Sequence, residues 1–328
     1  RDNVLFWFEE YHVDGLRWDA TSYMRVDAWG DNGDAWSLMQ WINDEVNQHF
    51  NWKINIAEDM WSSEWLTKPT PSGGAGFDSQ WDPNFVHPMR DAAITPSDQS
   101  RNMYSVRDAI AYAYNGAPFE RVIYTESHDE VANGKSRVPE EIYPGNADSW
   151  HSKKRSTLIA AALFTTAGIP QIFQGQEFLE DGFFDDNNPL DWGKYISFSG
   201  IHRLYQDLIS QRKNSLANTA GLKGAGTNVH HVNDSDKLIA YHRWDQGGAG
   251  DDTIILLNFS GNTQTNYSIG FPQAGTWHVR FNSDASVYDS AFGNVGSTTA
   301  TAYSGWKDGM PYQGPITIAP YSALILSQ

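Results

Sequence analysis

Cysteine is absent from this chain of 328 residues, so neither a disulfide framework nor a thiolate metal site can form. Positive charge is scarce, because 23 lysines and arginines stand against 40 aspartates and glutamates, and the net charge is −17 at pH 7. That charge argues against a nucleic-acid backbone as a partner. No apolar run is long enough to span a bilayer, and the start of the sequence has no signal-like segment. We therefore expect a soluble protein, whose 40% hydrophobic residues suffice for a substantial core.

Three short apolar runs in the first half of the chain each end in carboxylates. They cover residues 14–19, 54–59 and 122–129. Short buried strands read as apolar runs, and a (β/α) barrel presents its catalytic groups at the carboxyl ends of its strands. A single Asp at such a place often only caps the next helix. Three apolar runs that each end in carboxylates, with Arg17 before one carboxylate and His128 before another, indicate a catalytic site.

The segments DGLRWDA, IAEDM and ESHDE resemble three signature regions of the α-amylase family, glycoside hydrolase family 13. The resemblance implies that Asp19 is a nucleophile and that Glu58 is the general acid and base. It implies that Asp129 is a third carboxylate, which holds the substrate and stabilises the transition state. It also implies that Arg17 lies beside the nucleophile and that His128 binds the reacting sugar.

The chemistry explains why these residue types suffice. A retaining glycosidase needs two carboxyl groups roughly 5 Å apart, one to attack the anomeric carbon and one to protonate the departing oxygen. The acid must be protonated while the nucleophile is ionised, so their surroundings have to differ. We expect Asp19 and Asp129 to disfavour the anion of Glu58 by repulsion, and Arg17 to favour the anion of Asp19.

Tryptophans accompany two of the carboxylate segments. Sugar rings stack on aromatic faces, so we predict that Trp18, Trp61 and Trp65 lie in a glucan-binding groove. Trp7 and Trp41 occupy apolar positions of helical patterns, and we predict that they pack inside the protein.

Five strand-like runs precede the last third of the chain, at residues 15–20, 54–58, 76–81, 122–128 and 168–174. A closed barrel of this class needs eight strands. We therefore predict an α/β fold in which the chain supplies the later strands, about the fourth to the eighth, of a (β/α)8 TIM barrel. The other strands would come from an N-terminal portion of the same protein or from a second copy of the chain.

After about residue 215 the pattern changes to short strands broken by turns, at residues 237–242, 253–258, 276–281 and 317–326. This pattern is typical of a β-sandwich. It resembles the C-terminal all-β domain of many α-amylase family members. We predict two domains: residues 1–215 form the C-terminal part of the catalytic barrel, and residues 216–328 form the β-sandwich.

The reaction within the family stays open at this point. The segments Asp129–Val131, Asn133–Lys135 and Pro189–Trp192 resemble bacterial 1,4-α-glucan branching enzymes, whereas Trp18 and the sequence QGQE at residues 174–177 depart from them. The alternatives are a branching transferase, an amylase-type hydrolase that uses the same residues, and an inactive glucan-binding fragment. Each would take an α-glucan such as starch, glycogen or a maltooligosaccharide. A branching enzyme would be cytoplasmic, and an amylase would be secreted.

We expect no cofactor and assign no metal ligand. One oxygen-rich loop contains Asp181, Asp185, Asp186 and Asn187 and could bind Ca²⁺. We interpret it as an acidic surface loop.

Overall fold

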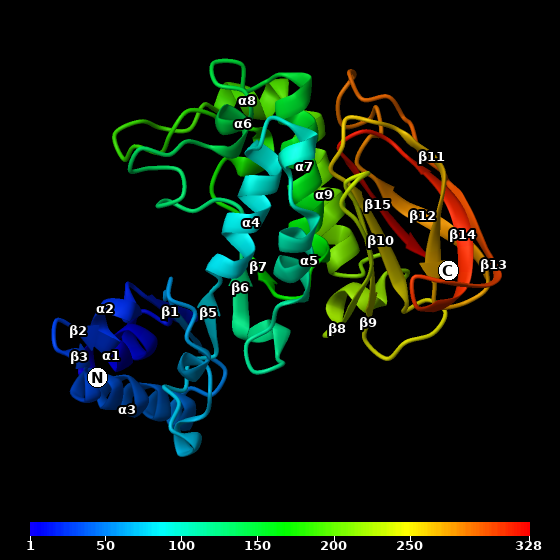
Figure 1. Cartoon of the computed structure of the whole chain (residues 1–328). Coiled ribbons are helices and arrows are strands. Elements are labelled where there is room, and N and C mark those ends of the chain that lie inside the picture. Colours follow the sequence, from blue (N-terminus) through cyan, green and yellow to red (C-terminus); the bar gives the residue numbers. More distant parts are fainter. The chain divides into compact units, whose positions relative to one another are not determined.

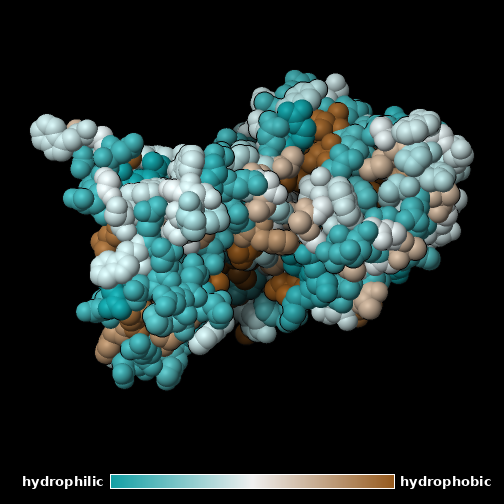
Figure 2. Space-filling view, turned by 90° about the horizontal axis from the view of Figure 1, so that it is seen from below, coloured by the Kyte–Doolittle hydropathy of each residue, from teal (hydrophilic) through white to brown (hydrophobic).

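The computed structural model describes residues 1–328 and divides them into two compact units (Figure 1). The first unit comprises Arg1–Asn84 and Tyr112–Ile123, and the second comprises Phe85–Ala111 and Tyr124–Gln328. None of the helices is long and apolar enough to cross a membrane. Figure 2 shows a face on which hydrophilic residues predominate and hydrophobic patches lie among them.

The first unit is built on short parallel strands in the order β1, β4, β5 and β6. Their bounds are Gly15–Trp18, Ile54–Ala57, Ser79–Trp81 and Arg121–Ile123. Three helices accompany them: α1 (Asp2–Glu10), α2 (Thr21–Arg25) and α3 (Gly33–His49). A small hairpin joins α2 to α3 and consists of β2 (Val26–Asp27) and β3 (Gly30–Asp31). Three 3₁₀ turns complete the unit: η1 (Glu64–Leu66), η2 (Thr70–Ser72) and η4 (Pro118–Glu120).

The apolar residues Leu38, Met39, Ile42 and Val46 recur at helical spacing and predict a helix over residues 37–50, and α3 begins four residues earlier, at Gly33. Its N-terminus is capped by Asn32, whose side-chain oxygen accepts a hydrogen bond from the backbone of Ala35 at 3.1 Å. Its apolar face buries Met39, Ile42 and Val46. This face packs in the small cores around the parallel strands, and thereby positions the ends of β1 and β4.

The second unit begins within α4 (Pro83–Ile94), whose first two residues belong to the first unit. The other helices are α5 (Met103–Ala111), α6 (Val138–Ile142), α7 (Trp150–Thr165), α8 (Trp192–Ser197) and α9 (Ser199–Arg212). A two-residue strand β7 (Ile169–Pro170) follows α7. The 3₁₀ turns are η3 (Asp98–Ser100), η5 (Gln176–Phe178) and η6 (Ala220–Lys223). Helix α7 is buried along almost its whole length, which its many small residues allow.

Eight antiparallel strands form the rest of the second unit, in the order β11-β14-β13-β12-β15-β10-β9-β8. Their bounds in chain order are Gly226–Asn233 (β8), Leu238–Trp244 (β9), Thr253–Asn258 (β10), Gln264–Phe271 (β11), Gly275–Asn282 (β12), Thr299–Lys307 (β13), Met310–Ile318 (β14) and Ser322–Ser327 (β15). Figure 1 shows β13 and β14 in one layer and β10, β12 and β15 in another. One apolar core lies between the layers, with Trp277 fully buried in it. The edge strands β8 and β11 are linked by a hydrogen bond of 2.9 Å between His231 Nε2 and the Tyr267 hydroxyl.

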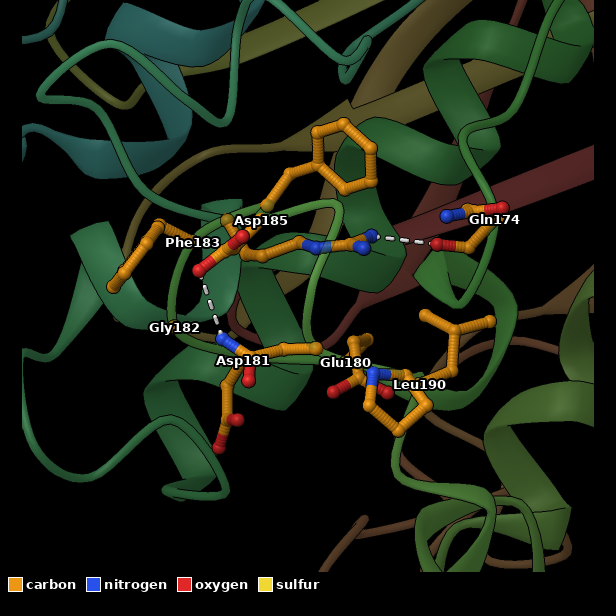
Figure 3. Close-up of a pocket in the computed structure, with 11 residues that line it drawn as sticks. Gln174, Glu180, Asp181, Gly182, Phe183, Asp185 and Leu190 are labelled. Atoms are coloured by element: carbon orange, nitrogen blue, oxygen red, sulfur yellow. Dashed lines mark hydrogen bonds between the residues drawn. The ribbon is translucent and has the colours of Figure 1, made fainter.

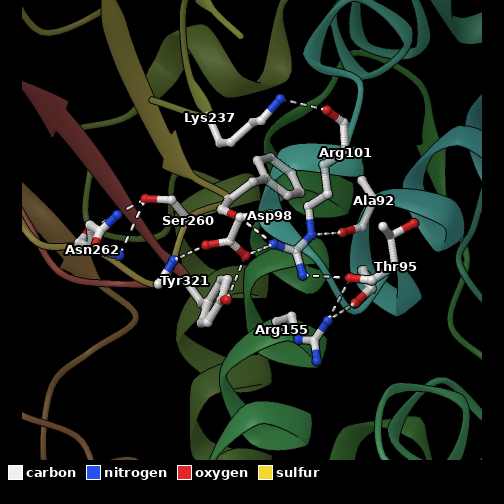
Figure 4. Close-up of polar contacts among 12 residues, drawn as sticks. Ala92, Thr95, Asp98, Arg101, Arg155, Lys237, Ser260, Asn262 and Tyr321 are labelled. Carbon is white, nitrogen blue, oxygen red and sulfur yellow. Dashed lines mark hydrogen bonds and ion pairs between the residues drawn. The ribbon is translucent and has the colours of Figure 1, made fainter. Parts of the chain in front are cut away.

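Helices and β-strands of the second unit are joined by a polar cluster around Asp98 (Figure 4). Asp98 forms an ion pair with Arg101 and accepts hydrogen bonds from the Tyr321 hydroxyl at 2.6 Å and from the Gly261 backbone at 2.7 Å. Lys237 Nζ donates to the carbonyl oxygen of Arg101 at 2.7 Å. Arg101 also donates to three backbone carbonyls, those of Ala92, Thr95 and Phe259. Segments far apart in the sequence therefore meet at one carboxylate.

The structure corrects several expectations. Residues 317–326 are not one strand, because β14 ends at Ile318 and the chain turns at Tyr321, whose φ is +42°, before β15 begins. The third and fourth strand-like runs shorten to β5 and β6, and the fifth shortens to β7. The predicted packing of Trp7 and Trp41 is wrong, because 39% and 52% of these residues stay exposed.

Candidate active site

Two predicted catalytic carboxylates lie together in the first unit, directly after β1 and β4. The two strands pair in parallel with Trp18 opposite Ala57, so Asp19 and Glu58 follow at the same edge of the sheet. Backbone hydrogen bonds continue beyond the strands: Glu58 N donates to Trp18 O, and Thr21 N donates to Glu58 O, both at 2.9 Å. The sheet register therefore determines how close these two residues lie.

Arg17 connects the two carboxylates. Its guanidinium forms one ion pair with Asp19 and another with Glu58, the second at 2.8 Å. The guanidinium also lies over the Trp81 ring, 4.4 Å from the ring centroid, which holds it in place. We expected Arg17 to favour Asp19. It contacts Glu58 as well, but only its contact with Asp19 is a hydrogen bond. The two carboxylates also differ in exposure, since the side chain of Asp19 is 78% exposed and that of Glu58 is 11% exposed.

Glu58 is further fixed by the backbone. Its Oε2 accepts a hydrogen bond of 2.7 Å from the amide of Ala20, a residue whose φ of +46° turns the chain after β1. The next residue, Asp59, is fully buried and accepts hydrogen bonds from Arg25 Nε at 2.7 Å and Nη2 at 3.1 Å. Asp59 also accepts one from the Trp61 amide at 2.9 Å. Our sequence reasoning did not identify Asp59 or Arg25 as supports of this site, although Asp59 belongs to the quoted IAEDM segment.

The predicted sugar-binding tryptophans have different surroundings. Trp61 is 52% exposed, and its ring lies 5.8 Å from that of Tyr23. Trp18 is only partly buried, but it packs edge-on against Phe77 with ring centroids 5.3 Å apart. Trp61 therefore keeps about half of its surface open, although the Arg25 guanidinium lies over its ring at 5.4 Å from the centroid, whereas Trp18 contributes to the core as well. Their roles in substrate binding stay predictions.

The other predicted site residues, His128 and Asp129, lie in the second unit. His128 Nε2 and Asp129 Oδ2 are 3.2 Å apart, and both side chains are about half exposed. The following residue, Glu130, is buried and contacts His87 at 3.1 Å and Lys135 at 2.9 Å. Burial acts to raise the pKa of Glu130, but the hydrogen bonds from His87 and Lys135 outweigh it and lower the pKa to about 2. Glu130 is thus an anchor for the Asp129 loop that our sequence reasoning missed.

A second buried carboxylate supports the same loop. Glu126 accepts hydrogen bonds from the Val138 amide at 2.7 Å and from Arg137 Nη1 at 3.3 Å, and burial raises its pKa. Arg137 Nη1 also donates to the carbonyl oxygen of Gln174 at 2.7 Å. Figure 3 shows the neighbouring pocket of about 220 Å³, which Glu180, Asp181 and Asp185 line with acidic side chains.

In the acidic loop that could bind Ca²⁺, Asp185 and Asp181 already bind other groups of the protein. Asp185 accepts hydrogen bonds from both the backbone and the side chain of Asn187, and another from Asn188. Asp181 forms an ion pair of 2.6 Å with Lys194. No group of three or more His, Cys, Asp or Glu side chains is placed to hold a metal ion. Our expectation of an acidic surface loop without a bound metal stays a prediction.

Comparison with known proteins agrees with this fold. Residues 229–328 match the family model of the alpha amylase C-terminal all-beta domain. The chain is 31% identical over 322 residues to a 1,4-alpha-glucan branching enzyme of Prochlorococcus marinus, covering 92% of this chain and 42% of that protein. It is 29% identical over 351 residues to one of Leifsonia xyli, covering 99% of this chain and 45% of the relative. The chain thus spans less than half the length of these relatives.

Among solved structures, a pullulanase of Anoxybacillus complexed with maltotriose covers the whole chain with a TM-score of 0.68 at 18% identity, and 44% of the pullulanase is matched. A putative alpha amylase of Salmonella typhimurium matches 99% of this chain with a TM-score of 0.65 at 15% identity, and the match covers 59% of the amylase chain. These comparisons confirm the resemblance to the α-amylase family. They also confirm the predicted fold class, in which later strands of a (β/α)8 barrel precede a C-terminal all-β domain. The boundary at residues 215 and 216 stays a prediction.

Proposed function

We propose that this chain is the C-terminal part of a retaining α-glucan-active enzyme, and that its reaction is 1,4-α-glucan branching. The observation that carries the proposal is the group formed by Arg17 in β1 with Asp19 and Glu58, which directly follow the adjacent parallel strands β1 and β4. The relatives that match more than 90% of this chain are named branching enzymes, and this supports the choice of reaction.

In the proposed mechanism, Asp19 attacks the anomeric carbon of an α-1,4-linked glucose while Glu58 protonates the departing 4-oxygen. The C–O bond to the leaving chain breaks and a covalent glycosyl–Asp19 ester forms. Glu58 then takes the proton of a 6-hydroxyl on an acceptor chain, and that oxygen displaces Asp19. Asp129 and His128 would hold the reacting sugar, following the family resemblance.

The remaining side chains have supporting roles in this proposal. Arg17 holds both reacting carboxylates through its two ion pairs. Trp61, with half of its surface open, would stack on a sugar ring next to the reacting one, and Trp18 would contact the sugar at the strand end. In this mechanism both side chains have to reach the substrate, Asp19 at the anomeric carbon and Glu58 at the glycosidic oxygen.

Branching and hydrolysis share the covalent intermediate and differ in the group that arrives second. The test incubates the protein with amylose and measures both the reducing ends released and the α-1,6 linkages formed. New branches with few reducing ends would support the transferase. Many reducing ends without branches would replace it by the amylase-type hydrolase. Binding of amylose with neither product would leave an inactive glucan-binding fragment. With branching activity we propose a cytoplasmic location.

We also propose that further strands complete the barrel. Strand β1 is an edge strand in this structure, with β4 as its one neighbour, and an open edge of a parallel sheet invites pairing. The added strands would come from an N-terminal portion of the same protein or from a second copy. Light scattering on the purified chain tests this. A monomer with full activity on glucan would refute it, whereas a dimer or activity restored by an added N-terminal portion would support it.

A further inference from the structure

Three asparagines in this chain are followed directly by glycine: Asn32, Asn115 and Asn133. Asparagine is a thermolabile residue, because its side-chain amide can be lost to attack by the next backbone nitrogen. Glycine favours this reaction, since it has no side chain to shield that nitrogen. The dipeptide is the same at all three positions, so a difference in their reactivity has to come from the folded structure.

Two of the positions occupy the same kind of turn. In residues 114–117 and again in residues 132–135, the fourth backbone nitrogen donates to the first carbonyl oxygen, at 2.7 Å and 3.0 Å. The central asparagine and glycine of each turn have positive φ, +53° and +76° in the first turn and +55° and +90° in the second, as a type I′ turn requires. All four central residues are exposed. The two turns therefore match in sequence, backbone and exposure.

The two turns differ in the contacts of the asparagine side chain. Asn115 Nδ2 donates to three acceptors: the carbonyl oxygen of Glu64 at 3.0 Å, Thr67 Oγ1 at 3.1 Å and Glu120 Oε2 at 2.8 Å. The side chain of Asn133 makes no hydrogen bond to the rest of the protein. The amide of Asn133 can therefore rotate freely, whereas that of Asn115 is held.

Asn32 is held in another way. Its Oδ1 accepts a hydrogen bond of 3.1 Å from the backbone of Ala35, and Gly33 is the first residue of α3. Rotation of this amide toward the Gly33 nitrogen breaks the cap of the helix, which opposes the reaction. Of the three asparagines, Asn133 is thus the one whose amide can turn toward the next backbone nitrogen without losing a hydrogen bond.

We propose that Asn133 is a site of spontaneous deamidation in the folded protein. The Gly134 nitrogen loses its proton to the solvent and attacks Cγ of Asn133. A C–N bond forms, the bond from Cγ to the side-chain nitrogen breaks, and ammonia leaves with a proton from the solvent. Water then opens the cyclic succinimide at one of its two carbonyls. The product is aspartate or, with the main chain rerouted through Cβ and Cγ, isoaspartate.

The modification changes a loop that is tied on both sides of the turn. Backbone hydrogen bonds to the segment 182–184 fix the loop at Val131 before the turn, at 2.7 Å, and at Arg137 after it, at 2.8 Å. Glu130 and Lys135 flank the turn and form an ion pair of 2.9 Å. Isoaspartate lengthens the main chain between these fixed points, and either product adds a negative charge to the segment. We therefore expect deamidation to weaken the contacts that hold the loop.

The test incubates the full chain at mildly alkaline pH, once folded and once in guanidinium chloride, and follows the three Asn-Gly peptides by mass spectrometry. Deamidation raises the peptide mass, and the aspartate and isoaspartate peptides separate by chromatography. Asn133→Gly is the control variant, because glycine fits the positive φ at this position and carries no side-chain amide.

In the folded protein we expect Asn133 to deamidate at least about tenfold faster than Asn115, because the Asn115 amide first has to break a hydrogen bond to a charged carboxylate. Asn32 should likewise be slow. In guanidinium chloride the three rates should come together, since the dipeptide alone then sets them. Equal rates at Asn115 and Asn133 in the folded protein, or no reaction at Asn133, would overturn the proposal.

Urea unfolding measures the effect on the loop. Incubated wild type should have a lower free energy of unfolding than fresh protein, whereas incubation should leave Asn133→Gly unchanged. Equal losses in both would refute the effect on the loop. A further effect on glucan turnover, through Asp129 just before this loop, rests on the proposed function. The deamidation rates do not, so a protein without any turnover still tests the modification.

Discussion

The Asp98 cluster allows a stability prediction that the structure makes quantitative. Replacing Asp98 by Ala removes the acceptor for the Tyr321 hydroxyl and the Gly261 amide, and it removes the ion-pair partner of Arg101. Arg101 is buried and loses its ion-pair partner, but it keeps its three backbone carbonyl acceptors, so its hydrogen bonds stay largely satisfied. The loss falls mainly on the contacts that join the helices to the β-strands (Figure 4).

The expected cost follows from those contacts. A hydrogen bond to a charged group contributes about 1.5–3 kcal/mol, and three such contacts disappear. The side chain of Asp98 is 29% exposed, so water screens part of each interaction. We therefore expect Asp98→Ala to lower the free energy of unfolding by about 3 kcal/mol. Asp98→Asn keeps one oxygen as an acceptor and should cost about 1 kcal/mol.

Urea unfolding followed by tryptophan fluorescence measures this cost. The matched control is Asp108→Asn in α5, because Asp108 is 67% exposed and pairs only with its exposed neighbour Arg107. That variant should change the free energy of unfolding by less than about 0.5 kcal/mol. A loss below about 1 kcal/mol for Asp98→Ala would refute the argument that Asp98 stabilises this junction.

The same residue predicts a pH dependence. Burial acts to raise the pKa of Asp98, but hydrogen bonds from Tyr321, Gly261 and Arg101 outweigh it and lower the pKa below the usual 3.8. A carboxylate with a lowered folded-state pKa stabilises the protein above its unfolded pKa, and loses that contribution as the pH falls below it. The difference between wild type and Asp98→Asn should therefore be full at neutral pH and shrink below pH 3.8. A difference that stays constant down to the acid transition would contradict this assignment.

Three further predictions concern the site and the β-strand core. We expect at least about a 100-fold lower turnover of α-1,4-glucan, with a nearly unchanged unfolding midpoint, in each of the variants Asp19→Ala, Glu58→Gln and Asp129→Asn, because these groups act mainly in the transition state. If a variant keeps near wild-type turnover, the replaced residue does not have its proposed catalytic role. Trp277→Ala should lower the free energy of unfolding, measured with urea, by about 3–5 kcal/mol, since removal of the fully buried indole leaves a cavity. A loss below about 1 kcal/mol would mean that the two layers move together and fill this cavity. Glu130→Gln should have a lower free energy of unfolding than the wild type above pH 4.5, and the difference should shrink as the pH falls toward the Glu130 pKa of about 2. A difference that stays constant over that pH range would refute the role of the Glu130 ion pairs.

The helices with a clear apolar period were predictable from local sequence. The pattern at residues 199–212 predicts α9 with the bounds that the structure has, because Ile201, Leu204 and Leu208 repeat at helical spacing and are buried. Strand β10 likewise coincides with the predicted residues 253–258, since all six are buried and read as an apolar run. In contrast, β8, β11 and β13 were not predicted. They carry many polar residues that are exposed or only partly buried, so they lack a clear apolar run, and their pairing with neighbouring strands makes them strands.

By itself the sequence determined which carboxylates are candidates for cleaving a glycosidic bond, because carboxylates at the ends of short apolar strands and the resemblance of their segments can be read locally. Only the tertiary structure decided how Arg17 is shared between Asp19 and Glu58, since the parallel register of β1 and β4 sets that geometry. It also decided that Asp59, Glu126 and Glu130 are buried supports. Burial and ion pairing join residues far apart in the chain, and no local pattern records such contacts.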